Sequence, residues 1–441
     1  MNTTIRPLAV SVMFACWSMG AQAGDFSNAV ILGDSLSDGG YYAAIGGQRF
    51  TTNPGKTAAE YVADNLGLST TPSNQGGSNY AQGGAKVNSD SLSTPPGYAQ
   101  RSVATQTNEY LASVGGKIPA NTLVMIQGGA NDAFQNMAAY GAGKISQADL
   151  GNLTKQSVVD LTTQVGRLAA SGSPYIMVQN MPNLGVTPAF TSQGSTAAAS
   201  ASQLAQGFNS GLNSALSQVN GNIVYLDTYH LITEIVANPT AYGFTNATGV
   251  ACTVSSSLFC SSNTLVSSDA ASTYVFADGV HPTTAAQKIN AQYALSVLNA
   301  PARVGLVSAA ATSSGASFAN TLSQYVPQSG DQTWHVYGDV SHAKRDWETG
   351  SSQPTSFLLG ADYRIGAKNN TRLGVTLGNQ HITGNFDANS GSFKLNEPNA
   401  SVYVSQNRAH NGWIAYMRYG RLNADIQRNI TLGSAQRTES G

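Results

Sequence analysis

Short apolar runs alternate with amphipathic stretches through residues 26–300. Four apolar runs, at 28–33, 122–127, 175–178 and 222–226, have the length and surroundings of buried strands. Apolar residues recur between them at helical spacing, as in Ala58, Tyr61, Val62 and Leu66, and again in Leu150, Leu153, Leu161, Val165 and Leu168. Strands that alternate with helices form crossover connections, which give a parallel sheet covered on both faces. This region is therefore predicted to be α/β.

The pattern changes after Pro301. Small residues dominate 302–328, which is typical of a slim helix or of a flexible linker. Beyond Asp331 apolar and polar residues alternate with a period of two, in strands of about ten residues separated by turn residues. The alternation predicts either part of an outer-membrane β-barrel, with aromatic residues at the strand ends, or a soluble β-sandwich with one face in water. The pattern contains five or six strands, fewer than the eight or so that a closed barrel needs.

The first 23 residues have the pattern of a secretory signal peptide. Arg6 precedes a short apolar run at 8–17, and the small residues of a cleavage site follow at Ala21-Gln22-Ala23. We expect cleavage after Ala23 and export of the remaining chain. The alternative is that this run forms a buried first helix.

Cysteine usage agrees with export. Cys16 lies within the predicted signal peptide, whereas Cys252 and Cys260 lie in a loop rich in Ser, Thr and Asn. In an oxidising compartment, two nearby cysteines predict a disulfide that closes a small loop, and two free thiols are the alternative. Neither cysteine has a His close by in sequence, so no zinc site is predicted from them.

Composition narrows the class of protein. The 22 Lys and Arg residues nearly balance 23 Asp and Glu in a chain of 441, and the net charge is −1. A nucleic-acid partner is excluded because binding it requires a basic surface. The hydrophobic content of 41% is enough for a core, which argues against general disorder. Outside the N-terminal region, no run approaches the ~20 apolar residues of a membrane-spanning helix.

Candidate catalytic residues stand at two places that are far apart in sequence. Ser35 directly follows the first predicted strand, and the carboxyl end of a parallel strand is where α/β sheets place their sites. A Ser hydroxyl needs an adjacent base that is itself oriented by a third group. Asp278 and His281, three residues apart, can supply the orienting group and the base. There is no G-x-S-x-G sequence, which disfavours the ordinary α/β-hydrolase route.

Donors for a developing oxyanion can be named as well. The backbone N–H groups of Ser35 and Gly84 and the side-chain amide of Asn131 would provide three. Asn131 follows the strand at 122–127 and so also projects from a carboxyl edge. Gly83 competes with Gly84, because the double glycine leaves the donor ambiguous by one residue.

Four segments together resemble the sequence blocks of the GDSL (SGNH) hydrolase family. They are GDSLSDGG at 33–40, NYAQGGA at 79–85, GGAND at 128–132 and DGVHPT at 278–283. The resemblance implies a flavodoxin-like three-layer α/β/α sandwich and ester hydrolysis. By motif position it implies Ser35 as nucleophile, His281 as base, Asp278 as its orienting group, and Ser35, Gly84 and Asn131 as oxyanion donors. It implies no metal and no organic cofactor.

The whole layout resembles the autotransporting lipases and esterases of Gram-negative bacteria. The layout predicts a signal peptide at 1–23, a hydrolase domain at 24–300, a helical linker at 301–330, and the N-terminal, incomplete part of a β-barrel at 331–441. The expected function is an exported or surface-displayed serine lipase or carboxylesterase that hydrolyses fatty-acid esters of glycerol through an acyl-enzyme on Ser35. Anchoring in the outer membrane is expected where the full barrel is present. The alternatives are an esterase for acetylated polysaccharide or lysophospholipid, and a non-catalytic surface adhesin on a hydrolase fold.

Overall fold

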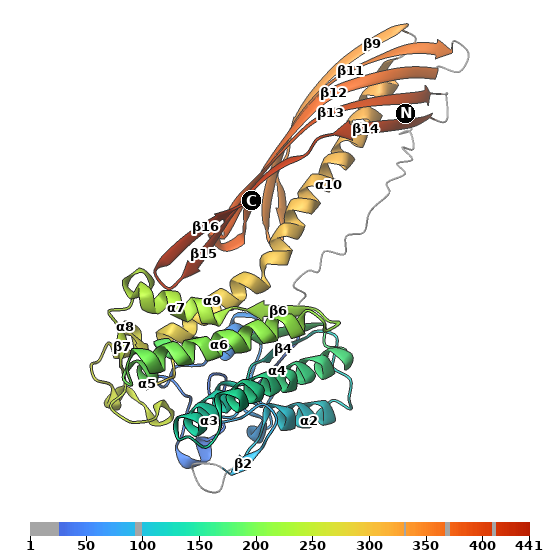
Figure 1. Cartoon of the computed structure of the whole chain (residues 1–441). Helices are drawn as coiled ribbons and strands as arrows, with labels where there is room; N and C mark the ends of the chain where they lie inside the picture. The colour runs from blue at the N-terminus through green and yellow to red at the C-terminus, as the bar shows by residue number, and fades with distance from the viewer. Residues whose placement is uncertain (1–25, 93–98, 330–331, 367–370, 408–411) are drawn as a thin grey trace. The chain divides into compact units, whose positions relative to one another are not determined.

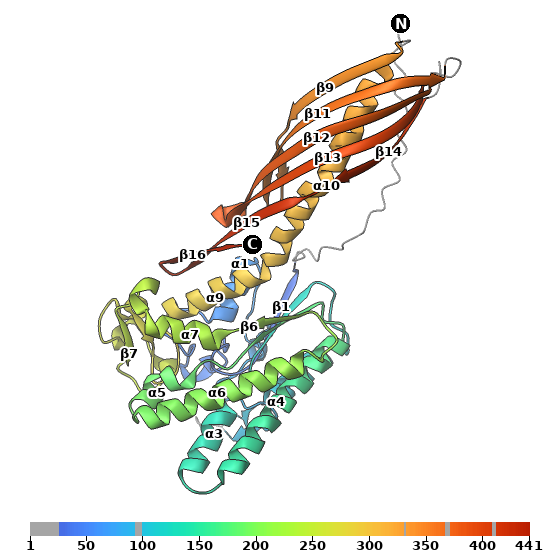
Figure 2. The same cartoon turned by 45° about the horizontal axis from the view of Figure 1, so that its top comes forward.

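A computed structural model of the chain is shown in Figures 1 and 2. It describes residues 26–92, 99–329, 332–366, 371–407 and 412–441. The predicted signal peptide at 1–23 lies outside the described residues. The described chain forms two compact units, and the main division lies between Leu298 and Asn299. Each unit is described by itself below.

A parallel sheet forms the centre of the first unit. Its strands stand in the order β1 (Asn28–Leu32), β4 (Thr122–Ile126), β5 (Tyr175–Gln179) and β6 (Ile223–Leu226). The segment around Asn79 makes a parallel bridge to Ile31 on the free side of β1. This arrangement has the strand order of a flavodoxin-like sheet, with a short bridge at the first edge instead of a full strand.

Helices cover both faces of this sheet (Figure 1). One face packs on α2 (Val103–Ser113), α4 (Gln147–Ala170) and α6 (Ser195–Leu216), and the other face packs on α1 (Ala58–Asn65) and α9 (Thr284–Leu298). Alternate residues of β1 and β4 enter opposite cores, since Val30 and Val124 lie in one buried cluster and Ile31 and Met125 in the other. Burial on both faces explains why these strands are continuous apolar runs.

Shorter elements surround the carboxyl edge of the sheet. They are β2 (Ser91–Leu92), β3 (Ala99–Gln100), α3 (Ala130–Gly141), α5 (Pro188–Thr191), α7 (Thr228–Ala237), β7 (Asn246–Val250), α8 (Ala270–Thr273) and β8 (Tyr274–Phe276). The parallel pair β7 and β8 leads the chain back to the sheet before α9.

An antiparallel sheet makes up most of the second unit. Its strands are β9 (Trp334–His342), β10 (Arg345–Trp347), β11 (Gly350–Gly366), β12 (Thr371–Phe386), β13 (Gly391–Asn407), β14 (Gly412–Gly420), β15 (Asn423–Leu432) and β16 (Ala435–Ser440). β9 and β10 pair with successive parts of β11, and β14 and β15 pair with successive parts of β13. The eight strands therefore form six rows. The alternation of apolar and polar residues predicted five or six strands. It does not show that one row is divided into β9 and β10 and another into β14 and β15.

On this sheet a row of apolar side chains is exposed and the neighbouring polar side chains are buried, the reverse of a water-soluble domain. On β12, Leu373, Val375 and Leu377 are 54%, 54% and 64% exposed, whereas their neighbours Arg372 and Thr376 are each 1% exposed. A soluble sandwich would bury the apolar row, so this alternative is rejected. Apolar residues outside and polar residues inside are the pattern of a membrane barrel wall.

Helix α10 (Ala300–Tyr325) lies along the inner face of the sheet (Figure 2). Its buried positions recur at three- and four-residue spacing: Leu306, Val307, Ala310, Ser314, Phe318 and Leu322. Ser314 Oγ donates to Glu397 Oε2 at 2.8 Å, and Arg418 pairs with the same carboxylate at 3.0 Å. The small residues of 302–328 thus belong to a helix rather than to a flexible linker for the most part. The combination of an α/β unit with an antiparallel β unit confirms the predicted fold class.

Candidate active site

Ser35 lies in a tight turn directly after β1. Ser37 N donates to Asp34 O at 3.1 Å, and Leu36 N donates to Asp34 Oδ1 at 3.0 Å, so the turn is closed by backbone and side chain of one residue. Gln127, just beyond β4, donates from Nε2 to the same oxygen at 2.6 Å. Burial raises the pKa of Asp34, although these hydrogen bonds and the charge of His281 favour its ionised form. The turn is thereby tied to the neighbouring strand.

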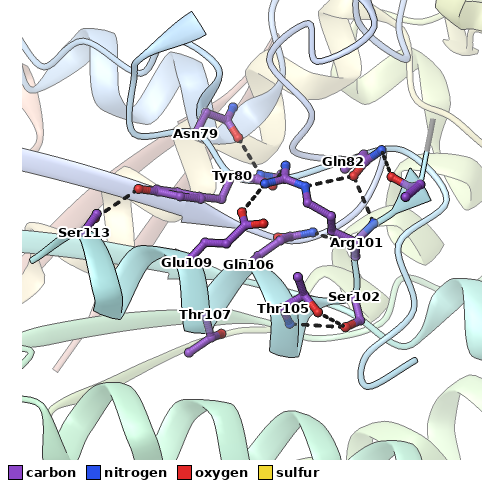
Figure 3. A network of polar contacts seen from close by, with 12 residues as sticks. Asn79, Tyr80, Gln82, Arg101, Ser102, Thr105, Gln106, Thr107, Glu109 and Ser113 are labelled. Atoms are coloured by element: carbon purple, nitrogen blue, oxygen red, sulfur yellow. Dashed lines mark hydrogen bonds and ion pairs between the residues drawn. The ribbon is translucent and has the colours of Figure 1, made fainter. Parts of the chain in front are cut away.

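The residue before this turn is held from helix α2. Gly33 N donates to Gln106 Oε1 and Gln106 Nε2 donates to Gly33 O, both at 2.8 Å. Figure 3 shows Gln106 beside Gln82 and Arg101, whose backbone N and Nε both donate to Gln82 Oε1 at 3.0 and 3.1 Å. Arg101 also pairs with Glu109 of α2. This network joins the nucleophile turn to the segment that carries the glycine pair.

Asp278 and His281 stand between β8 and α9 and reach Ser35 across 246 positions of sequence. His281 Nε2 lies 2.8 Å from Ser35 Oγ, and His281 Nδ1 lies 2.9 Å from each carboxylate oxygen of Asp278. An ionised carboxylate can only accept, so Nδ1 carries the proton and Nε2 is left to accept from the Ser35 hydroxyl. This is the hydrogen-bond relay that activates a serine hydroxyl.

The charge of Asp278 is favoured by its surroundings. Burial opposes ionisation, but the charge of His281 and several hydrogen bonds outweigh it and lower the pKa of Asp278 well below its ordinary value. The donors are the Nδ1 of His281 and three backbone groups, including Ser257 N at 2.7 Å and Val280 N at 3.0 Å. Asp278 therefore stays an anion that can orient His281 and stabilise its protonated form.

Ser257 belongs to the loop that contains the two mature cysteines. The structure joins Cys252 and Cys260 in a disulfide, with both side chains buried. Ser257 lies between them, and its carbonyl oxygen accepts from Asn53 Nδ2 at 3.1 Å. The closed loop thus presents one backbone N–H to the carboxylate of Asp278.

The glycine pair is tied to the segment that carries Ser35. Gly83 N donates to Asp38 Oδ2 at 2.8 Å, so this N–H is not free for a substrate. Gly84 has a φ of +82°, and among the described residues its N–H has no acceptor. Asn131 Nδ2 donates to Ala85 O at 2.9 Å, which holds the side-chain amide next to Gly84. One amide hydrogen of Asn131 remains available.

An apolar cleft opens beside Ser35 and His281. Its walls come from the nucleophile turn, α3, the loop after β5, α7 and α9. The apolar side chains that line it are Leu36, Ala130, Phe134, Pro182, Leu184, Leu231, Ile232, Ile235, Phe276, Val280, Pro282 and Ala286. Such a cleft suits an apolar group attached to the reacting carbonyl.

Several contributors to the site were not assigned from sequence. Asp38, Gln106 and the N–H of Ser257 act through backbone contacts that no motif spacing reveals. Asp38 did stand within the GDSLSDGG segment, which was the available signal. Within the described ranges, no group of three or more His, Cys, Asp or Glu side chains could hold a metal ion.

Two known protein families match successive parts of the chain. Residues 30–294 match the GDSL-like lipase/acylhydrolase family, and this match covers more than half of the chain. The chain belongs to that family. Residues 332–441 match the autotransporter β-domain. The chain is therefore an ester hydrolase that carries an autotransporter β-domain, the arrangement of an exported, surface-displayed enzyme.

Similar proteins come from bacteria and from a plant. Esterase EstA of Pseudomonas aeruginosa is 28% identical over 500 residues, which cover 99% of this chain and 74% of that protein. Lipase 1 of Photorhabdus luminescens is 28% identical over 346 residues, which cover 64% of this chain and 52% of that protein. A GDSL esterase/lipase of Arabidopsis thaliana is 26% identical over 290 residues, 55% of this chain. The chain thus spans about half the length of Lipase 1.

Proposed function

We propose that this family member is a serine carboxylesterase or lipase that hydrolyses fatty-acid esters through an acyl-enzyme on Ser35. The observation that carries the proposal is the relay from Ser35 through His281 to Asp278 at the mouth of an apolar cleft. The cleft favours a long apolar acyl chain over an acetyl group, which needs little apolar surface. The names of the relatives, Lipase 1 and Esterase EstA, agree with ester substrates of this kind.

The reaction follows from the direction of each hydrogen bond. His281 Nε2 takes the Ser35 proton while Oγ attacks the ester carbonyl, and the oxyanion accepts from Ser35 N, Gly84 N and Asn131 Nδ2. The protonated His281, stabilised by Asp278, then gives its proton to the leaving alcohol. Water attacks the acyl-enzyme with His281 again as base, which releases the acid and restores Ser35.

The alternatives differ in the substrate or in turnover itself. An esterase for acetylated polysaccharide would favour an acetyl ester, and a lysophospholipid hydrolase would favour a long acyl chain on a charged headgroup. A non-catalytic adhesin would not need a serine hydroxyl hydrogen-bonded to an oriented histidine. The apolar cleft and the intact relay favour the fatty-acid esterase over the acetyl esterase and over the adhesin.

The test is hydrolysis of p-nitrophenyl esters from acetate to palmitate by the full chain in detergent, beside its Ser35→Ala variant. We expect kcat/KM to rise from acetate towards longer chains, and Ser35→Ala to reduce kcat by roughly a thousand-fold or more without changing the melting temperature much. Near-normal activity in folded Ser35→Ala would reject the mechanism. Activity on acetate alone would redirect the assignment to deacetylation.

A further inference from the structure

Asp38 ends the nucleophile turn and is fully buried. Its Oδ1 accepts from Gly40 N at 2.9 Å and from Tyr41 N at 2.7 Å, within its own segment. Its Oδ2 accepts from Gly83 N at 2.8 Å, 45 positions away in sequence. One carboxylate therefore links the segment that carries the nucleophile to the glycine pair.

The peptide between Gly83 and Gly84 is held through its carbonyl oxygen. Gly83 O accepts from Tyr42 Oη at 2.8 Å and from Gln100 Nε2 at 3.3 Å. The carbonyl of Gly83 and the N–H of Gly84 belong to one planar trans peptide and point in opposite directions. The bonds to Gly83 O therefore set the direction of Gly84 N–H, and the bond from Gly83 N to Asp38 fixes the peptide before it.

Packing leaves the glycine pair little room to move. A Cβ on Gly83 would lie 2.3 Å from the ring of Phe50, and a Cβ on Gly84 would lie 2.0 Å from the amide of Gln100. The ring of Phe50 also lies 5.0 Å from the ring of His281, centroid to centroid. The backbone at Gly83 is thus packed against the same side chain that touches the catalytic base.

We propose that Asp38 is a positioning residue that aims the Gly84 N–H at the oxyanion, by holding the Gly83 peptide against the nucleophile turn. The inference rests on the proposed function, since it deepens the account of the same site. Asp38 itself does not touch the substrate. Its contribution is stabilisation of the transition state, because only the developing oxyanion needs the aimed donor. Loss of Asp38 should lower kcat while leaving KM nearly unchanged.

The charge state of Asp38 gives the proposal a pH signature. Burial, with a smaller contribution from the charge of Glu60, raises the pKa of Asp38 to about 6, although its three backbone donors favour the anion. The other groups that face it are Arg49, which is paired with Glu60, and Tyr42. Protonation of Asp38 puts a hydrogen on a carboxylate oxygen that already accepts a hydrogen bond from a backbone N–H, so that bond is weakened. The aimed arrangement is therefore present above the pKa of Asp38 and is lost as pH falls through about 6.

Asp38→Asn is the decisive variant because it has the same shape without the charge. If the amide oxygen keeps Gly40 N and Tyr41 N, its NH₂ group faces Gly83 N, donor against donor. We expect kcat to fall by roughly 10- to 100-fold, less than or comparable to complete loss of one oxyanion donor, with KM within about twofold. The inhibition constant of an alkyl trifluoromethyl ketone, which forms a tetrahedral adduct on serine, should rise by the same factor as kcat/KM falls.

The pH profile separates positioning from a merely structural effect. In the wild type, protonation of Asp38 should lower kcat by roughly a further 10- to 100-fold as pH falls through about 6, so the acid limb of log kcat should be steeper there than in the variant. In Asp38→Asn this additional step should be absent. An unchanged kcat, or an unchanged acid limb, in folded Asp38→Asn would overturn the proposal.

Two further variants provide a matched control and a replacement for Asp38→Asn. Asp149→Asn is the matched control, because Asp149 Oδ2 accepts Ser146 N at 2.9 Å at the exposed start of α4, far from the glycine pair in sequence. We expect its kcat and pH profile to equal those of the wild type. If Asp38→Asn fails to fold, Tyr42→Phe removes the bond to Gly83 O and should lower kcat several-fold at constant KM. An unchanged kcat in folded Tyr42→Phe would then overturn the proposal.

The outcome for Ser35→Ala keeps the two proposals distinct. Activity that survives Ser35→Ala would reject the proposed function whatever Asp38 does. Activity that depends on Ser35 but not on Asp38 would reject this inference alone.

Discussion

The two units of this chain use polar side chains in opposite places. In the hydrolase unit the strands are apolar on both faces, and the polar groups gather where the strands end, as Ser35 and Gln127 do. In the β unit the order is reversed on β12, where Leu373, Val375 and Leu377 are exposed while Arg372 and Thr376 are buried. The comparison shows that buried side chains do not always form an apolar core. In water the apolar side chains face inward, whereas in the wall of a membrane barrel they face outward to the lipid.

Buried charges are also satisfied differently in the two units. Asp38 and Asp278 accept mostly from backbone N–H groups, which cannot rotate away and so fix the chain around the site. In the β unit Arg372 pairs with Asp362, and Arg418 pairs with Glu397, side chain to side chain. Backbone donors give the hydrolase unit the positional accuracy that catalysis needs. Side-chain pairs serve mainly to neutralise the interior of the β unit.

The largest effect is expected from Asp278→Asn, which removes the charge that orients the catalytic base. An amide can no longer accept all the donors around it, and it permits the wrong tautomer of His281. We expect kcat on a p-nitrophenyl ester to fall by roughly 10³- to 10⁴-fold, with a small change in KM. Steady-state kinetics would measure the loss, and circular dichroism would verify the fold. A loss below tenfold would show that the carboxylate does not orient the base.

A charge on the outer face of the β unit tests the other side of the comparison. Val375→Arg puts a guanidinium in the exposed apolar row of β12, where lipid contact should make it cost about 2–4 kcal/mol of unfolding free energy. Guanidinium unfolding in phospholipid vesicles, followed by tryptophan fluorescence, would measure this. Three of the four tryptophans, Trp334, Trp347 and Trp413, lie in the β unit, and the fourth lies in the predicted signal peptide.

His381→Arg is the matched control on the same strand. His381 is on the same exposed row as Val375 but among polar neighbours, so the charge should cost at most about 1 kcal/mol there. Equal effects of the two variants would show that the apolar row does not face lipid.

Sequence reasoning reached the architecture because periodicity is a local property. The period of two beyond Asp331 and the apolar runs before Pro301 each lie within one strand, so the two folds could be predicted. It also named Ser35, Asp278 and His281 as reacting groups, because these stand in recognisable segments. The interruption of a barrel row between β14 and β15 leaves no such local pattern.

The contacts that support the site could not be predicted from the sequence, for a different reason. Asp38 meets Gly83 across 45 positions, and Ser257 meets Asp278 across 21, in both cases through a backbone N–H that every residue type possesses. The residue types of Gly83 and Ser257 do not indicate that their backbone N–H groups make such a bond. Only the folded chain shows which N–H lies beside which carboxylate, and so which of the two glycine N–H groups has no acceptor among the described residues.

The smallest effect is expected from opening the disulfide loop, which supports Asp278 without touching the reacting atoms. The Cys252→Ala, Cys260→Ala double variant frees a loop with a sequence separation of 8, and loop entropy makes this cost about 2–3 kcal/mol of unfolding free energy. Ser257 N should then hold Asp278 less firmly, so we expect kcat to fall by about two- to fivefold, the size of one weakened hydrogen bond, at unchanged KM.

Temperature separates these two consequences of opening the loop. Kinetics measured well below the melting temperature report only the orientation of Asp278, since nearly all molecules are folded there. Reduction of the wild type with dithiothreitol should reproduce the change in kcat, and the reductant should have no effect on the double variant. A lower melting temperature with an unchanged kcat would mean that the loop stabilises the hydrolase unit without orienting its catalytic aspartate. In that case the backbone bonds from Val280 and His281 would suffice to hold Asp278 in place.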